Sequence, residues 1–166
     1  MVTLYLDMKI GIIGAGDVGG TLGMRWRQKG HEIMFGIRNR QSQKVQKLIE
    51  LDKNLQFGDI RETVAFGDVI VFAVPWTSIE ETIRRAGNLS DKILIDPTNP
   101  LTPDLKELAL GNNSAAEKTS NMAKSTKVVK AFNMIGATTL NNLIFDSQRA
   151  DLFICGDDSH AKQIVR

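Results

Sequence analysis

Three glycines near the amino-terminal end have a spacing that suits phosphate chemistry. Gly14, Gly16 and Gly19 form the pattern G-x-G-x-x-G, which follows the run KIGII and precedes an amphipathic helical pattern. In such a unit the first glycine permits a tight turn, the second lets a pyrophosphate approach the backbone, and the third lets the helix pack on the strand. Free N–H groups and the helix dipole then hold the phosphates. The pattern predicts a dinucleotide site, and the alternative is a glycine turn that binds nothing.

The next expected strand ends in an arginine. The stretch MFGIRNR covers residues 34–40, and it lacks the Asp or Glu that usually binds a ribose hydroxyl about 20 residues past the glycines. The planar guanidinium of Arg38 suits a phosphate dianion, through paired charge-assisted hydrogen bonds. We therefore predict the 2′-phosphate of NADP beside Arg38, and the alternative is a solvated surface arginine. Arg40 and Lys44 are candidates to assist, although Lys44 is also explained as decoration of the next helix.

The elements that must position these residues follow from the pattern of the whole chain. Short β-branched runs alternate with helical patterns, which favours a Rossmann-type, doubly wound α/β fold with a mainly parallel sheet. Strands are expected at residues 9–13, 32–35, 55–57 (weakly), 69–73, 92–95, 127–130 and 152–155. Helices are expected at residues 18–28, 41–51, 60–66, 78–85 and 138–143, with a broken stretch over 105–123 and a mobile loop over 110–120. A last helix is expected to begin in DDSHAKQIVR, with Asp157, Asp158 or Ser159 as its cap.

Special residues gather where the expected strands end. The segments that follow five consecutive strong strands are GAGDVGG, GIRNR, VPW, DPTNP and AFNMIGA. They carry glycine, proline, amides or arginine in place of generic turn residues. Because open parallel sheets bind ligands beyond the carboxyl ends of their strands, these segments are expected to form one site.

Taken together, these motifs resemble the NADP oxidoreductases that depend on the deazaflavin coenzyme F-420, and the related NADPH-binding domains of membrane ferric reductases. The resemblance runs from Met8 to the last residue and rests on IGAGDVG, FGIRN, AVPW, DPTNPL, VVKAFNMIGA and CGDD. It implies a pyrophosphate lined by Ala15, Gly16, Asp17 and Val18, with the 2′-phosphate at Arg38. It further implies that the nicotinamide side is flanked by Val74, Pro75 and Trp76, with Asn133 and Ala137 close by.

The chain departs from this family at two places. Ile37 stands where the family commonly has a serine, which removes one phosphate hydrogen bond. Family members also continue past GDD through segments that help form the acceptor pocket and often the dimer. We therefore expect the C-terminal part of the family to be missing, with a homodimer or a partner subunit in contact through this end. Residues 1–166 are expected to form one NADP-binding domain, of which 1–7 are an N-terminal extension.

The composition argues against several classes of partner. The formal net charge of +2 comes from 21 basic and 19 acidic residues, which are spread along 166 residues without a dense basic stripe. Neither nucleic acid nor an anionic membrane is therefore expected as a partner. The apolar stretches are shorter than the roughly 18 residues of a membrane helix, and MVTLYLDMK does not resemble a secretory signal. The single cysteine fits a reducing compartment, so we expect a cytoplasmic protein.

Other reactive residue types form no catalytic or metal-binding arrangement in the sequence. Cys155 in the run LFIC is expected to be a buried, inert thiol, His31 an outward-facing turn residue and His160 a solvated one. Asp96 is expected to order the DPTNP loop by capping backbone N–H groups and not to act as an acid or base. Trp76 is either a wall of the nicotinamide pocket or an interface residue. No catalytic residue and no metal site is expected.

The function expected from these residues and from the resemblance is hydride transfer between NADPH and a deazaflavin or flavin-type acceptor. This reaction requires two rings held face to face, and the cofactors carry its chemistry. The absence of an acid–base pair is therefore compatible with an enzyme. The alternative is an NADP(H)-binding sensor or subunit module without turnover of its own.

Overall fold

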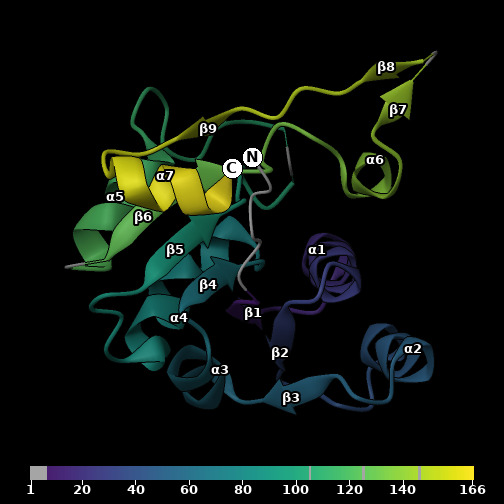
Figure 1. Cartoon of the computed structure of the whole chain (residues 1–166). Coiled ribbons are helices and arrows are strands. Elements are labelled where there is room, and N and C mark those ends of the chain that lie inside the picture. Colours follow the sequence, from purple (N-terminus) through teal and green to yellow (C-terminus); the bar gives the residue numbers. More distant parts are fainter. Residues whose placement is uncertain (1–6, 105, 125, 146) are drawn as a thin grey trace.

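The computed structural model describes residues 7–104, 106–124, 126–145 and 147–166 (Figure 1). Within these residues one sheet has seven strands in the order β3-β2-β1-β4-β5-β6-β9. The six strands from β1 to β6 each pair in parallel with their neighbours in the sheet, and β9 runs antiparallel to β6. The order of the six parallel strands is that of the Rossmann fold, as the sequence predicts.

The strands lie close to their expected positions. The sheet strands are β1 (Lys9–Ile13), β2 (Glu32–Gly36), β3 (Gln56–Gly58), β4 (Val69–Phe72), β5 (Ile93–Asp96), β6 (Lys127–Ala131) and β9 (Ile154–Cys155). The expected strand at 152–155 is therefore only half as long, and it lies antiparallel at the sheet edge. A separate hairpin of β7 (Ile144–Phe145) and β8 (Gln148–Arg149) stands where no strand was expected.

The helices also agree with the sequence, except between β5 and β6. They are α1 (Asp17–Gln28), α2 (Gln43–Leu51), α3 (Ile60–Phe66), the 3-10 turn η1 (Trp76–Ser78), α4 (Ile79–Ala86), α5 (Ala115–Met122), α6 (Ala137–Asn141) and α7 (Ser159–Val165). The expected mobile loop over 110–120 is wrong from Ala115 onward, because the Ser114 side chain accepts a hydrogen bond from the Glu117 N–H and caps α5. Among the described helices, none is long and apolar enough to cross a membrane.

Side chains alternate between two cores on opposite faces of the sheet. Ile12 and Val71 point into a core that α1, α2, α6 and α7 cover, whereas Ile13, Ile70 and Phe72 point into a core formed with α3 and α4. Figure 1 shows α1 and α2 on one side of the sheet and α3 and α4 on the other. Because both faces are covered, β4 is buried at all four positions. The sheet is therefore a rigid base for the loops at its carboxyl edge.

Two residues lie in surroundings opposite to those expected. His31 is buried, and its Nδ1 accepts a hydrogen bond from the Met8 N–H at 3.3 Å, so it closes the turn between α1 and β2 from inside. Cys155 is exposed, because β9 is a two-residue edge strand. The apolar run LFIC misled the sequence interpretation, since Leu152 and Phe153 are exposed as well. His160 is exposed, as expected.

Candidate functional site

The five special strand ends come together at one edge of the sheet. β2, β1, β4, β5 and β6 are neighbours in this order and run parallel, so their carboxyl ends point the same way. This confirms that the segments after these strands share an edge. The segments at this edge are distant in the sequence, because the first follows β1 and the last follows β6.

The glycine turn has a steric reason at two of its glycines. Gly14 has φ +105°, and a Cβ there would collide with the Ala73 carbonyl oxygen. At Gly19 a Cβ would collide with the Gly14 carbonyl oxygen and lie 2.9 Å from the Ala73 Cβ, so glycine lets α1 approach β4. A Cβ on Gly16 would meet no atom within 4 Å. Gly16 caps α1 without a side-chain hydrogen bond, so the backbone N–H groups of the first turn are available to a ligand in this space.

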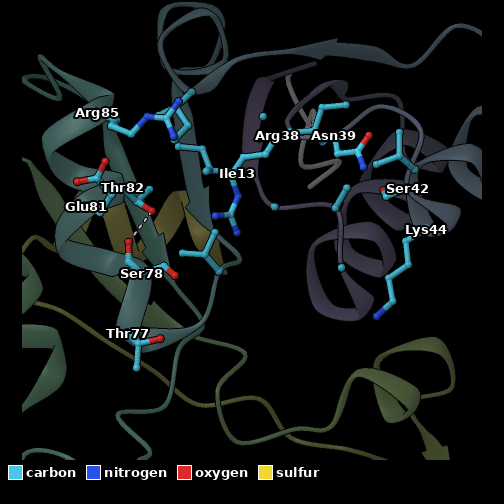
Figure 2. Close-up of a pocket in the computed structure, with 18 of the residues that line it drawn as sticks. Ile13, Arg38, Asn39, Ser42, Lys44, Thr77, Ser78, Glu81, Thr82 and Arg85 are labelled. Atoms are coloured by element: carbon cyan, nitrogen blue, oxygen red, sulfur yellow. Dashed lines mark hydrogen bonds between the residues drawn. The ribbon is translucent and has the colours of Figure 1, made fainter. Parts of the chain in front are cut away.

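A cavity of about 650 Å³, the first cavity, lies beyond the glycine turn on the side of β2. Its walls come from the glycine turn, the loop after β2, the start of α2 and the face of η1 and α4 (Figure 2). Its lining includes Gly14, Ala15, Gly16, Gly36, Ile37, Arg38, Asn39, Ser42, Gln43, Lys44, Val74, Thr77, Ser78, Glu81, Thr82 and Arg85. The volume lies within the range of about 300–1,000 Å³ that is typical of ligand pockets.

Arg38 reaches from the end of β2 into the first cavity, toward α4, and Arg85 reaches toward it from the opposite wall (Figure 2). The loop that carries Arg38 is fixed by backbone contacts. The Ile37 N–H donates to the Gly58 carbonyl at 3.0 Å, and the Gln41 N–H donates to Asn39 Oδ1 at 2.9 Å. None of the ion pairs found among the described residues involves Arg38. Arg38 is exposed, so its guanidinium is available to an anion.

The two cations named as assistants to Arg38 lie in different places. Arg40 stacks on the Phe57 ring at 5.3 Å from its centroid and is not part of the cavity wall. Lys44 lines the cavity from the first turn of α2, and its Nζ lies 2.8 Å from Asp17 Oδ2. Lys44 therefore lies at the cavity and is not simply a solvated residue on the surface of α2.

A second cavity of about 670 Å³ lies on the other side of the glycine turn. It is lined by Gly16, Asp17, Val18, Lys44, Ala73, Val74, Pro75, Trp76, Thr77, Pro97, Thr98, Asn99, Leu101, Thr102 and Pro103. Gly16, Lys44, Val74 and Thr77 belong to both linings. The two cavities therefore form one groove that passes over the glycine turn.

Trp76 lies on the wall of the second cavity together with Val74 and Pro75. Its half-buried ring packs against the core on the α3 and α4 side of the sheet, and Lys118 Nζ lies 5.9 Å from the ring centroid. Of the two interpretations of Trp76, the cavity wall agrees with its position.

Asn133 and Ala137 do not line either of the two cavities. The Asn133 carbonyl accepts a hydrogen bond from Asn99 Nδ2 at 2.8 Å, and Asn133 Nδ2 donates to Asn99 Oδ1 at 3.3 Å. Asn133 therefore adjoins the second cavity through Asn99. Ala137 begins α6, which packs on α1, and it lines neither cavity.

Sequence reasoning missed the far wall of the first cavity. Ser78 ends η1, and Glu81 and Arg85 belong to α4. The sequence signal for Glu81 and Arg85 was the amphipathic pattern IEETIRRA. Asp96 behaves as expected, because its Oδ1 accepts from the Thr98 N–H at 2.9 Å. No sequence pattern predicted that Lys130 contacts the same carboxylate.

The mainly parallel sheet, the glycine turn and the groove across the carboxyl edge define a Rossmann-type dinucleotide-binding domain. The family model described as "NADP oxidoreductase coenzyme F420-dependent" matches residues 9–100, more than half of the chain. The chain belongs to this family of NADP-dependent oxidoreductases.

Individual relatives agree with this assignment. The F420-dependent NADP reductase of Methanocaldococcus jannaschii is 27% identical over 173 residues, covering 95% of this chain and 77% of that protein. The metalloreductase STEAP3 of Rattus norvegicus is 32% identical over 157 residues, covering 95% of this chain. The chain spans 30% of the length of this metalloreductase.

The fold recurs in solved structures. A protein of Arthrobacter sp. FB24, assigned as an F420-dependent NADP reductase, superposes with a TM-score of 0.85 at 24% identity, over 95% of this chain and 78% of that one. Pyrroline carboxylate reductase of Plasmodium falciparum with NADP bound superposes with a TM-score of 0.61 at 17% identity, over 96% and 53% of the two chains. At these identities the superpositions establish the fold alone.

Proposed function

We propose that the chain binds NADP(H) along the groove and passes hydride between NADPH and a deazaflavin or flavin-type acceptor. The observation that carries the proposal is the continuity of the groove. It runs from Arg38 in the first cavity, over Gly16, to Trp76 in the second. A dinucleotide has the same sequence of parts, with a phosphorylated ribose at one end, a pyrophosphate in the middle and a reactive ring at the other end.

The residues of the groove suit the cofactor at each of these parts. The space next to Gly16 is open, and the positive end of α1 faces it, which favours the pyrophosphate beside Ala15, Gly16, Asp17 and Val18. Among the described lining residues of the first cavity, Arg38, Lys44 and Arg85 are cationic and Glu81 is acidic. This charge balance favours a 2′-phosphate there, with Arg38 as its main partner.

In the proposed arrangement, Val74, Pro75 and Trp76 bound the nicotinamide and keep water away from it. When bound there, NADPH would supply the hydride, and a deazaflavin or flavin ring would be its acceptor. Such transfer requires the two rings to lie about 3–3.5 Å apart, and a small misplacement reduces the rate by about 100-fold. The chain's own contribution is therefore orientation and water exclusion, with no group acting as acid or base.

The choice of acceptor rests on the relatives. Two of them are F420-dependent NADP reductases, from Methanocaldococcus jannaschii and Methanothermobacter thermautotrophicus, and a third is a metalloreductase. We therefore put the deazaflavin first and a flavin second.

We also propose contact with a second copy of the chain through the exposed apolar residues Ile144, Leu152 and Phe153 near the hairpin and β9. Light scattering of the wild type and of Phe153→Ser tests this contact, and a monomeric wild type would refute it.

Two measurements on one sample test the function. Calorimetric titration is expected to show NADPH binding at least about tenfold more tightly than NADH, because one charge-assisted pair contributes about 1.5–3 kcal/mol. NADPH oxidation is then followed with the deazaflavin, FMN and FAD as acceptors, and we expect saturable turnover with the deazaflavin. Tight binding without turnover on any acceptor would favour the sensor or subunit module. Equal affinities for NADPH and NADH would refute the role of Arg38.

A further inference from the structure

A buried charged pair joins β5 to β6 directly behind the second cavity. Asp96 ends β5 and is paired in register with Lys130 on β6. The Asp96 side chain is fully buried, 12% of the Lys130 side chain is exposed, and Lys130 Nζ lies 3.2 Å from Asp96 Oδ2. The pair by itself is expected to add little to stability, because removal of both charges from water offsets much of their attraction. Its presence therefore calls for an explanation other than stability.

Both members of the pair hold Thr98. Asp96 Oδ1 accepts from the Thr98 N–H at 2.9 Å and from Thr98 Oγ1 at 2.7 Å, and Lys130 Nζ donates to the Thr98 carbonyl. Asp96 Oδ2 also accepts from Thr119 Oγ1 on α5 at 3.5 Å. Within the described residues no buried side-chain polar atom lacks a partner, so this network is satisfied. Both backbone polar groups of Thr98, its N–H and its carbonyl, are thereby held by hydrogen bonds.

The network continues into the loop after β6. Asn99 exchanges two hydrogen bonds with Asn133, one through the Asn133 carbonyl and one through its side chain. The preceding residue, Phe132, has φ +66°, a conformation that costs free energy for an aromatic residue. Its ring packs edge-on against Trp26 at 5.8 Å between centroids, which holds this turn. The segments after β5 and β6 are thus locked to each other.

The locked segment is a wall of the second cavity, because Pro97, Thr98 and Asn99 line it. We propose that Asp96 and Lys130 are positioning residues that hold this wall at the distance needed to orient the reactive ring of the cofactor. The inference rests on the proposed function, in which that ring lies in the second cavity. Neither side chain is assigned a contact with the cofactor. The pair acts through Thr98 and Asn99, and it fixes the place of the ring more than it stabilises the fold.

The test compares two ligands that differ only at the ring end. NADPH fills both cavities in the proposed arrangement, whereas 2′-phospho-ADP-ribose lacks the nicotinamide. Lys130→Met is expected to bind NADPH about tenfold more weakly, which corresponds to about 1.4 kcal/mol of lost contact at the ring end. It is expected to bind 2′-phospho-ADP-ribose as the wild type does. Lys130→Arg keeps the charge and is expected to retain most of the NADPH affinity. Lys127→Met, an exposed lysine on the same strand, is the matched control and is expected to change neither.

A second variant guards against misfolding. The double change Asp96→Asn with Lys130→Met leaves no unpaired buried charge, and it is expected to show the same selective loss of NADPH affinity in folded protein. An equal loss of affinity for both ligands would mean that the pair of Asp96 and Lys130 only supports the fold. An unchanged affinity for NADPH would mean that the pair does not position the wall. Either result overturns the inference. A wild type that binds neither ligand would instead refute the proposed function.

Discussion

Lys44 at the start of α2 forms an ion pair with Asp17 at the start of α1, with 2.8 Å between Nζ and Oδ2. The pair spans the groove where the two cavities meet, since both side chains line the second cavity and Lys44 also lines the first. Asp17 by itself would repel the pyrophosphate of a dinucleotide. Lys44 balances this carboxylate, although both side chains are largely exposed and their attraction is screened by solvent.

Lys44→Ala is expected to weaken NADPH binding about two- to fivefold, because it leaves Asp17 unbalanced and removes a cation from the groove. Asp17→Asn should have the opposite sign and strengthen binding slightly. Calorimetric titrations at low and high salt check both variants, and the differences should shrink as salt rises. Weaker binding by Asp17→Asn would contradict this account.

Arg38→Ala is expected to erase most of the preference for NADPH over NADH, through a loss of about 10- to 100-fold in NADPH affinity. Affinity for NADH should change little, because NADH lacks the 2′-phosphate. Arg40→Ala is the charge-matched control, since Arg40 stacks on Phe57 outside the cavity. An equal effect of the two substitutions on the NADPH-to-NADH ratio would show that net charge and not the position of Arg38 sets the preference.

Ile37→Ser is expected to widen the preference for NADPH and to destabilise the fold. A serine adds a hydroxyl beside Arg38, but the half-buried Ile37 packs against the core on the α1 side of the sheet. We expect a loss of about 1–2 kcal/mol in the free energy of unfolding from the lost apolar contact. Urea unfolding and the two titrations measure both effects, with Ile37→Val as the control for packing. A narrower preference would mean that the hydroxyl does not reach the phosphate.

Gly16→Ala and Gly19→Ala are expected to separate binding from folding. A methyl group on Gly16 meets no protein atom, so stability should hold while the pyrophosphate is pushed away and NADPH affinity falls by about tenfold or more. A methyl group on Gly19 collides with the Gly14 carbonyl, and we expect about 1–3 kcal/mol of destabilisation. Thermal unfolding and NADPH titration of both variants check the pair. Normal NADPH binding by Gly16→Ala would place the pyrophosphate elsewhere.

Acid should weaken the capping of α7. The pKa of Asp158 is lowered from 3.8, first because its carboxylate accepts the Ala161 N–H, and further because Lys127 and His160 lie near. A lowered folded-state pKa stabilises the protein above the unfolded-state value, and this contribution is lost as pH falls through the folded-state pKa. The advantage of the wild type over Asp158→Asn should therefore be full near pH 6 and shrink below pH 3.8. Unfolding midpoints over this range measure it, with Asp157→Asn as control, and an advantage that grows in acid would contradict the assignment.

Local pattern was sufficient for some parts of this molecule and not for others. The glycine turn and Arg38 could be predicted, because their spacing along a strand–turn–helix unit fixes their geometry. The α4 wall with Glu81 and Arg85 could not, since it depends on how α4 packs beside the end of β2. The burial of His31 also escaped the sequence, because its partner is a backbone N–H 23 residues away.

The shared lining of the two cavities has a consequence for how tightly fragments of the cofactor bind. In the proposed arrangement Arg38 would hold the adenosine half of NADPH, and the covalent link between the two halves would keep the ring half near Trp76 at an effective concentration of the order of millimolar. A weak contact at the ring end then contributes fully to the intact cofactor. The two halves offered separately should bind far less tightly than NADPH, even at saturating concentrations of the other half.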